Sequence, residues 1–257
     1  MEPDLAWWPF ALVFGVALAV ALIGTPVAAA LGRRWGMVDK PDPRRWHPGA
    51  IPRTGGIALF AAFITAAVLA QWLPVPRLDP KEFTRFLGIA LGMTFLFGVG
   101  LVDDRLELAP GPQYVVQALS GLIAIAFLVF IERVMNPFTN QLTIFPMLLT
   151  VIITLVWIMG MINTVNLLDG VDGLAAGVGA IVSAVLAIHM LREGQYSVAL
   201  LPLALLGASL GFLPFNFYPA RVFLGSGSWV LGYAIATLGI AAGAKLALIQ
   251  LVLSIPI

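Results

Sequence analysis

Acidic and amide side chains stand at regular spacing at two places where long apolar runs end. Asp103 and Asp104 are adjacent at the end of one run. Asn166, Asp169 and Asp172 follow at intervals of three in the segment NTVNLLDGVDG. Carboxylate and amide oxygens are the ligands that Mg²⁺ prefers, and this ion commonly bridges to substrate phosphates. The pattern therefore predicts a cation site that handles a phosphorylated substrate.

The aspartate pair has a simpler interpretation that must be weighed. Two neighbouring carboxylates at the C-terminal end of a helix repel each other and oppose the helix dipole. A solvated loop would tolerate Asp103 and Asp104, so an ordinary surface turn is the alternative. A bound divalent cation removes both objections, which favours a cation site.

The asparagine-rich segment is more specific. If it is helical, Asn166, Asp169 and Asp172 share one face. If it is a broken turn around Gly170 and Gly173, its backbone amides become available to a phosphate. The alternative, a helix N-cap followed by glycine packing, accounts for Asp172 alone. Acidic residues this close to hydrocarbon are costly, and they indicate function.

A basic segment with the sequence DKPDPRRWHPGAIPRTGG occupies residues 39–56. It contains Lys40, Arg44, His47 and Arg53 beside a glycine pair. A positive rim next to a bilayer attracts an anionic lipid headgroup or a nucleotide diphosphate. The alternative is that these bases only hold the loop on one side of the membrane.

The elements that must position these residues are membrane helices. Of the 257 residues, 60% are hydrophobic and only 11% are charged, and the mean hydropathy is +0.99. A soluble domain needs far more charge, so the bilayer is the expected solvent. Nucleic acid is not an expected partner, because bases cluster in one loop only. The absence of Cys excludes disulfides and thiolate metal sites.

Apolar runs of about 20 residues, the length that spans a bilayer, repeat along the chain. We expect an all-α, polytopic transmembrane helical bundle of about eight or nine spans that forms a single domain over residues 1–257. A ninth run, 245–257, is short for a span. The eight longer runs lie near 6–31, 55–73, 84–102, 115–131, 143–161, 173–190, 197–216 and 228–244.

The distribution of bases predicts the orientation. The 32–54 loop is rich in Arg and Lys, whereas the N-terminal tail holds Glu2 and Asp4 and no base. The positive-inside rule therefore places the N-terminus outside and this loop in the cytoplasm. The loops near 103–114, 162–172 and 217–227 follow on the cytoplasmic side, so all the polar clusters are expected on one face.

Four motifs in order resemble those of a known family. They are DKPDPRRWHPGAIPRTGG at 39–56, GLVDDRLELAP at 100–110, NTVNLLDGVDGLAAG at 163–177 and NFYPARVFLG at 216–225. The chain resembles the polyprenyl-phosphate N-acetylhexosamine-1-phosphate transferases of glycosyltransferase family 4. It is more similar to the GlcNAc-1-phosphate branch than to the MurNAc-pentapeptide branch.

The resemblance implies an Mg²⁺-dependent reaction, with Mn²⁺ as a substitute. Undecaprenyl phosphate attacks a UDP-N-acetylhexosamine and UMP leaves, which is the first membrane step of cell-envelope polysaccharide synthesis. The implied location is the bacterial inner membrane with a cytoplasmic active face, and family members often form homodimers. The implied catalytic residues are Asp103, Asp104 and Asp169; the metal ligands are Asn166 and Asp103; and the substrate-binding residues are Lys40, Arg44, His47, Arg53, Asp172 and Phe223, the last stacking on uracil.

The chain departs from the family pattern in three ways. The segment FLGSGS, 223–228, stands where the family has FMGDxGS, whose Asp binds the metal, and Gln113 stands where Lys is common. The family's further C-terminal helices and His-rich loop have no counterpart, so the chain resembles a C-terminally truncated member. These departures keep a second hypothesis open, a non-catalytic paralogue that binds polyprenyl phosphate or a nucleotide sugar. A transporter is disfavoured, because the acids gather on one face.

Overall fold

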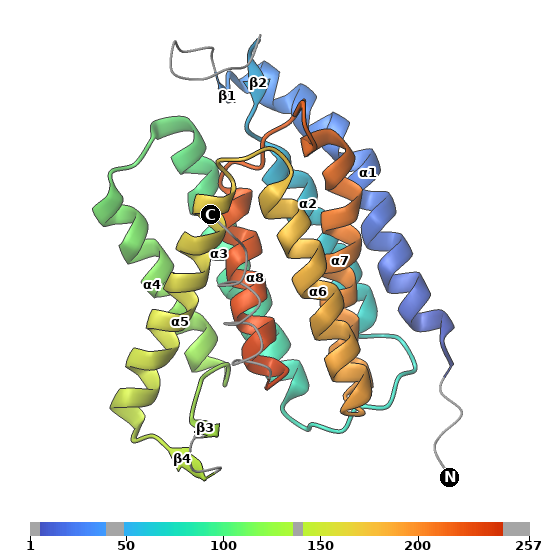
Figure 1. Cartoon of the computed structure of the whole chain (residues 1–257), viewed down its shortest axis with the longest axis vertical. Coiled ribbons are helices and arrows are strands. Elements are labelled where there is room, and N and C mark those ends of the chain that lie inside the picture. Colours follow the sequence, from blue (N-terminus) through green and yellow to red (C-terminus); the bar gives the residue numbers. More distant parts are fainter. Residues whose placement is uncertain (1–5, 40–48, 136–140, 244–257) are drawn as a thin grey trace.

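The computed structural model describes residues 6–39, 49–135 and 141–243, and eight α-helices account for most of them. Figure 1 shows the helices running alternately up and down along the long axis. Two small antiparallel sheets, β1–β2 and β3–β4, lie at opposite ends of the bundle. The helices are α1 (Trp8–Trp35), α2 (Gly55–Ala70), α3 (Glu82–Leu106), α4 (Pro110–Ala126), α5 (Met147–Leu168), α6 (Leu174–Arg192), α7 (Tyr196–Asn216) and α8 (Gly227–Ala241); the strands are β1 (Val38–Asp39), β2 (Ile51–Pro52), β3 (Arg133–Met135) and β4 (Leu142–Ile144).

The all-α, membrane-type fold agrees with the sequence prediction. Five helices are long and apolar enough to cross a membrane, namely α1, α3, α5, α6 and α7. The helices α2 and α8 are apolar but have only 16 and 15 residues. At 1.5 Å per residue they extend about 24 Å or less, which is shorter than a typical hydrocarbon core of about 30 Å. The predicted ninth run lies outside the described residues.

Helix ends differ from the predicted runs where local chemistry decides them. The fourth run was predicted to begin near residue 115, but α4 begins at Pro110, which follows the extended Ala109. Proline suits the first position of a helix because its missing N–H would be unpaired there anyway. The fifth run was predicted to end near 161, but α5 continues to Leu168 and carries Asn163 and Asn166 within its last turns.

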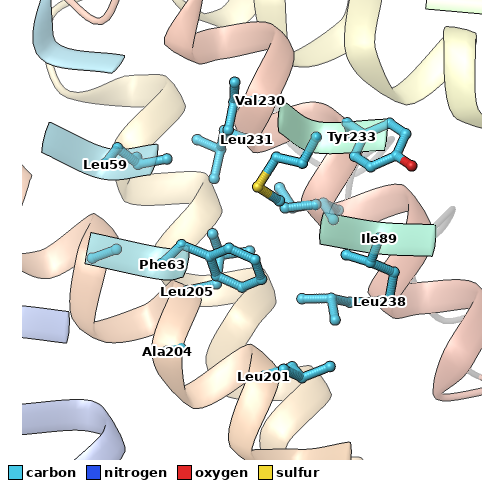
Figure 2. Packing of buried hydrophobic residues seen from close by; sticks show 14 of the residues in the cluster. Leu59, Phe63, Ile89, Leu201, Ala204, Leu205, Val230, Leu231, Tyr233 and Leu238 are labelled. Carbon is cyan, nitrogen blue, oxygen red and sulfur yellow. The ribbon is translucent and has the colours of Figure 1, made fainter. Parts of the chain in front are cut away.

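The helix α8 forms the centre of the bundle. All residues from 227 to 240 are buried, and the helix packs against α2, α3, α5, α6 and α7. Figure 2 shows Leu231 and Leu238 of α8 in one cluster with Leu59 and Phe63 of α2 and with Ile89 of α3. A helix surrounded by protein on all sides has no lipid-facing stripe, so it fixes the relative positions of its neighbours.

A glycine seam joins α1 to α7. A Cβ atom on Gly207 would lie 2.5 Å from the carbonyl oxygen of Phe14, and one on Gly211 would lie 2.6 Å from that of Leu18. Small residues four apart let two membrane helices approach closely, where van der Waals packing drives association. This seam holds the C-terminal end of α7, from which the loop to α8 departs.

The described residues of the predicted polar clusters lie at one end of the bundle, as the sequence indicated. The C-terminal ends of α1, α3, α5 and α7 meet the N-terminal ends of α2, α4, α6 and α8 there (Figure 1). The opposite end has its own polar contacts: Glu82 accepts a hydrogen bond from the Ser197 hydroxyl and pairs with Arg77. We call the first end the site end.

Candidate functional site

The site is built around the turn Gly225–Ser228, which connects α7 to α8. The preceding residues bind the start of α2 through the backbone: the N–H groups of Gly55 and Gly56 donate to the carbonyl oxygens of Phe223 and Leu224, each at 2.9 Å. The Phe223 N–H donates to the Pro52 carbonyl at 2.8 Å. Three hydrogen bonds between this loop and the stretch from β2 to the start of α2 fix the turn at the site end.

Glycine is required at two points of this arrangement. Gly225 has a φ of 62°, and a Cβ there would collide with the carbonyl oxygen of Arg53 and lie 2.9 Å from Asp104 Oδ1. A Cβ on Gly56 would lie 2.5 Å from the Gly227 Cα. The first turns of α2 and α8 therefore touch backbone to backbone, which brings Arg53 and the turn together.

The two neighbouring aspartates point in different directions. Asp104 faces the turn: its Oδ1 accepts the Ser226 N–H at 2.9 Å, and its Oδ2 accepts the Ser226 hydroxyl at 2.6 Å. Asp103 faces the start of α4, where its Oδ1 accepts the Leu108 N–H at 3.0 Å and the Gln113 amide at 3.1 Å. Successive residues in a helix are about 100° apart, which separates the two carboxylates.

The asparagine-rich segment combines the two predicted conformations. Asn163 and Asn166 lie on the last turns of α5. The helical structure is interrupted from Asp169 to Gly173, and we call this segment the α5–α6 break. Asn166 reaches the turn, since its Oδ1 lies 2.9 Å from the Ser228 hydroxyl. Asn163 points instead to α4 and pairs with Gln117, the Asn163 Nδ2 lying 2.7 Å from Gln117 Oε1.

The α5–α6 break is attached to the segment that follows α7. Asp172 Oδ2 accepts the Ala220 N–H at 2.9 Å, and Asn216 Oδ1 accepts the Gly173 N–H at 3.1 Å. Asn216 is buried and also donates to the Val222 carbonyl at 3.0 Å. The Gly173 amide is therefore already paired and is not open to a phosphate. These bonds fix the position of Asp169 at the start of the break.

Asp169 is the acid with the most unusual environment. Burial raises the pKa of its carboxyl to about 8, the nearby Arg53 opposes this increase, and the charges of Asp104 and Asp172 add to it. Its carboxylate accepts no hydrogen bond from the part of the chain that the structure describes. A largely desolvated acid that is only partly compensated and faces other acids is typical of functional sites.

Five predicted residues belong to the basic segment or the α7–α8 loop. Arg53 lies at the site, its guanidinium 3.9 Å from the exposed carboxylate of Glu107. Phe223 is half-buried in the loop, and its stacking on uracil stays a prediction. Lys40, Arg44 and His47 lie outside the described residues. Among the predicted bases within the described residues, Arg53 lies near the acids.

The donor set fits a divalent cation that is shared with substrate. Among the described residues, no three His, Asp or Glu side chains gather into a self-sufficient metal centre. Mg²⁺ commonly takes one or two protein carboxylates and completes its shell with phosphates and water. The Asp169 carboxylate, which has no hydrogen-bond partner among the described residues, and the exposed Asn166 offer such oxygens. The predicted roles of Asn166 and Asp103 as metal ligands stay predictions.

Sequence reasoning missed the residues that connect the clusters. Ser226 and Ser228 were assigned no role from the sequence, although they contact Asp104 and Asn166. Asn216 was part of a recognised motif, but nothing assigned it a role. The signal that could have found them is the position of polar side chains immediately beside glycines that permit close backbone approach.

Comparison with known proteins gives the class to which this fold and site belong. A profile of glycosyl transferase family 4 matches residues 86–243, a range that contains the aspartate pair, the asparagine-rich segment and the serine turn. The chain belongs to glycosyl transferase family 4.

Individual relatives come from two branches of the family. The chain is 32% identical over 235 residues to a Bacillus subtilis protein named "Probable undecaprenyl-phosphate N-acetylglucosaminyl 1-phosphate transferase", covering 89% of this chain and 62% of the relative. It is 32% identical to the decaprenyl-phosphate N-acetylglucosaminephosphotransferase of Mycobacterium tuberculosis H37Rv, covering 88% and 58%. It is 30% identical to the phospho-N-acetylmuramoyl-pentapeptide-transferase of Latilactobacillus sakei, covering 89% and 74%. The chain thus spans about three fifths of the length of the first two.

Proposed function

We propose that this protein transfers N-acetylglucosamine 1-phosphate from UDP-GlcNAc to undecaprenyl phosphate and releases UMP. One observation carries the proposal: Asp104 from α3 and Asn166 from α5 bind the same four-residue turn, with Asp169 and Arg53 beside them. Acids, an amide and a base held together at a helix-bundle end suit a diphosphate and its cation. The names of the first two relatives both contain the sugar, N-acetylglucosamine, and the name of the Bacillus subtilis relative contains the lipid, undecaprenyl phosphate.

Positioning and electrostatics are the expected sources of catalysis, as in other phosphoryl transfers. Asn166 and Asp169 would hold Mg²⁺, with Asp103 as a further ligand, and the cation would neutralise the diphosphate of the UDP-sugar. Arg53 would bind a phosphate oxygen, Asp172 would line the nucleotide-sugar site and Phe223 would stack on the uracil. Asp103 and Asp104 would orient the lipid phosphate.

The setting of the reaction is proposed with it. We place the site end at the cytoplasmic leaflet of a bacterial inner membrane, with eight membrane-inserted helices in one transferase-like domain and the N-terminus outside. The bases of the 32–54 loop support this orientation. A polyprenyl phosphate in that leaflet reaches the site end with its phosphate at the depth of Asp103 and Arg53.

UMP release tests the proposal. Purified full-length protein in detergent is given undecaprenyl phosphate, UDP-GlcNAc and Mg²⁺. We expect release by the wild type and a loss of at least about 100-fold in kcat for Asp103→Asn and for Asp169→Asn, the scale of removing an electrostatic group at a reacting centre. Glu193→Gln, an exposed acid at the opposite end of the bundle, is the matched control and keeps full activity. Undiminished turnover in both aspartate variants would contradict the assignment.

A second function is favoured by one feature of the turn. The segment FLGSGS, 223–228, which contains the turn, holds no acid, and Ser226 is engaged with Asp104. A non-catalytic protein that binds polyprenyl phosphate or UDP-GlcNAc would keep the Asn166 and Asp169 geometry without needing a further metal ligand. Saturable UDP-GlcNAc binding by calorimetry, together with no UMP release at any Mg²⁺ or Mn²⁺ concentration, would support this second function over the first.

A further inference from the structure

Two serine hydroxyls of the turn each contact a different polar residue of the site. Ser226 is 5% exposed and Ser228 is fully buried, so bulk water does not compete for the hydrogen bonds of either hydroxyl. Ser226 contacts Asp104, and Ser228 contacts Asn166. The two serines lie on a turn that is held by the backbone of Gly55 and Gly56. The backbone positions from which the two hydroxyls extend are therefore fixed.

The contact between Ser226 and Asp104 restricts the carboxylate at both oxygens. The Ser226 N–H lies 2.9 Å from Oδ1 and 3.2 Å from Oδ2, and the hydroxyl lies 2.6 Å from Oδ2. Gly100 closes the other side of Ser226, since a Cβ there would lie 2.7 Å from the Ser226 Cβ. Hydrogen bonds to a carboxylate are among the stronger ones. Asp104 is therefore held in one orientation.

The contact between Ser228 and Asn166 has a chemical constraint of its own. The Ser228 hydroxyl has one proton but lies 2.9 Å from two oxygens, the Gly225 carbonyl and Asn166 Oδ1. Both bonds form at once if the Asn166 amide turns over, so that its NH₂ donates to Ser228 while Ser228 donates to Gly225. Amide orientation is assigned by such networks. The Asn166 carbonyl oxygen then points away from the turn, and Asn166 is an exposed residue.

We propose that Ser226 and Ser228 are positioning residues: Ser226 fixes the Asp104 carboxylate, and Ser228 orients the Asn166 amide with its oxygen toward a bound divalent cation. The proposal rests on the proposed function for its cation. Groups that orient a metal ligand commonly change metal affinity or activity by about 10- to 100-fold when removed. The turn Gly225–Ser228 contains no acid, but through these two serines it positions the Asp104 carboxylate and the Asn166 amide.

Mn²⁺ binding tests the Ser228 part without any turnover. Free Mn²⁺ is measured by electron paramagnetic resonance in full-length protein with UDP-GlcNAc present. Ser228→Ala is expected to raise the Mn²⁺ Kd about tenfold. In the Asn166→Ala background, Ser228→Ala is expected to have no further effect, because the serine acts through the amide. Ser183→Ala is the matched control: it removes another buried hydroxyl, one that bonds the Gly179 carbonyl in α6.

Steady-state kinetics test the Ser226 part. Ser226→Ala is expected to lower kcat about tenfold or more and to leave the KM for UDP-GlcNAc within about twofold. The melting temperature of each serine variant, from tryptophan fluorescence, is expected to match that of Ser183→Ala. A rise in KM with unchanged kcat would overturn the role of Ser226.

The outcomes separate the two proposals. Wild-type Mn²⁺ affinity in Ser228→Ala, additive effects with Asn166→Ala, or a wild-type protein that binds no Mn²⁺ would each overturn the positioning role. A wild-type protein that binds Mn²⁺ but releases no UMP would instead overturn the proposed function. In that case the Mn²⁺ measurements on Ser228→Ala and the double variant still decide whether Ser228 orients Asn166.

Discussion

At the scale of single residues, Asp169 is the group whose behaviour departs most from that of a free side chain. Its carboxyl has a pKa of about 8, because it is buried and faces Asp104 and Asp172, with only partial compensation from Arg53. Below that pH it carries a proton as long as no cation is bound. A divalent cation beside it would favour the charged form, so cation binding and proton release are coupled.

This coupling predicts the pH dependence of cation affinity. Mn²⁺ affinity in the presence of UDP-GlcNAc should rise as the pH increases from 6 to 8, by up to about tenfold per unit, and level off above 8. Electron paramagnetic resonance of free Mn²⁺ at several pH values measures it. Asp169→Asn should bind more weakly and lose most of the dependence. An equally steep dependence in that variant would assign the proton to another group.

The sequence located the polar residues of the site but not their contacts. Asp104, Asn166 and Asp169 were predicted to meet, and the structure connects the first two through one turn and places the third beside them. Asp103 and Asp104 were treated as a unit, yet they diverge because helix geometry separates adjacent side chains. The connecting serines could not be inferred, since their role depends on a backbone approach between α2 and α8 that no local pattern encodes.

At the scale of secondary-structure elements, hydrophobicity found the helices and local chemistry set their ends. All eight predicted longer runs correspond to helices. Pro110 moved the start of α4 toward the N-terminus, and the polar end of α5 stayed helical through Asn166 although it looked like a loop. Apolar composition cannot distinguish a polar helix end from a loop, because a helix that ends in protein rather than lipid can carry amides in its last turns.

The approach of α2 to α8 predicts a sensitive glycine. Gly56→Ala places a Cβ 2.5 Å from the Gly227 Cα, and backbone cannot yield as a side-chain tip can. We expect a loss of stability of about 1–3 kcal/mol, seen as a lower melting temperature by tryptophan fluorescence in detergent. Gly98→Ala in α3, where a Cβ meets nothing within 4 Å, is the control. Equal melting temperatures for the two variants would show that the helices are not in tight contact.

At the scale of the whole molecule, the two ends of the bundle differ in chemistry. The site end holds Asp104, Asn166, Asp169 and Arg53, whereas the opposite end holds a structural cluster around Glu82. In the proposed orientation, the bases of the 32–54 loop hold the site end on the cytoplasmic side. A substrate made in the cytoplasm would then meet the site without crossing the membrane.

This orientation can be checked directly, because the chain has no Cys of its own. Single variants Arg34→Cys, at the site end of α1, and Glu193→Cys, after α6, place exposed thiols at opposite ends. In intact cells, a membrane-impermeant maleimide should label Glu193→Cys and leave Arg34→Cys unlabelled until the membrane is permeabilised. The reverse labelling would place the site end outside and remove the access of a cytoplasmic nucleotide sugar.

The central position of α8 has a consequence for how the protein is made. Among the described helices, it is the last to leave the ribosome, yet it occupies the middle of the bundle. The seven helices synthesised earlier must leave the central position open for α8. That position stays unfilled until translation reaches residue 241. When α8 enters, its leading turn delivers Ser226 to Asp104 and Ser228 to Asn166. Packing of α8 and assembly of the site are therefore one event in biogenesis.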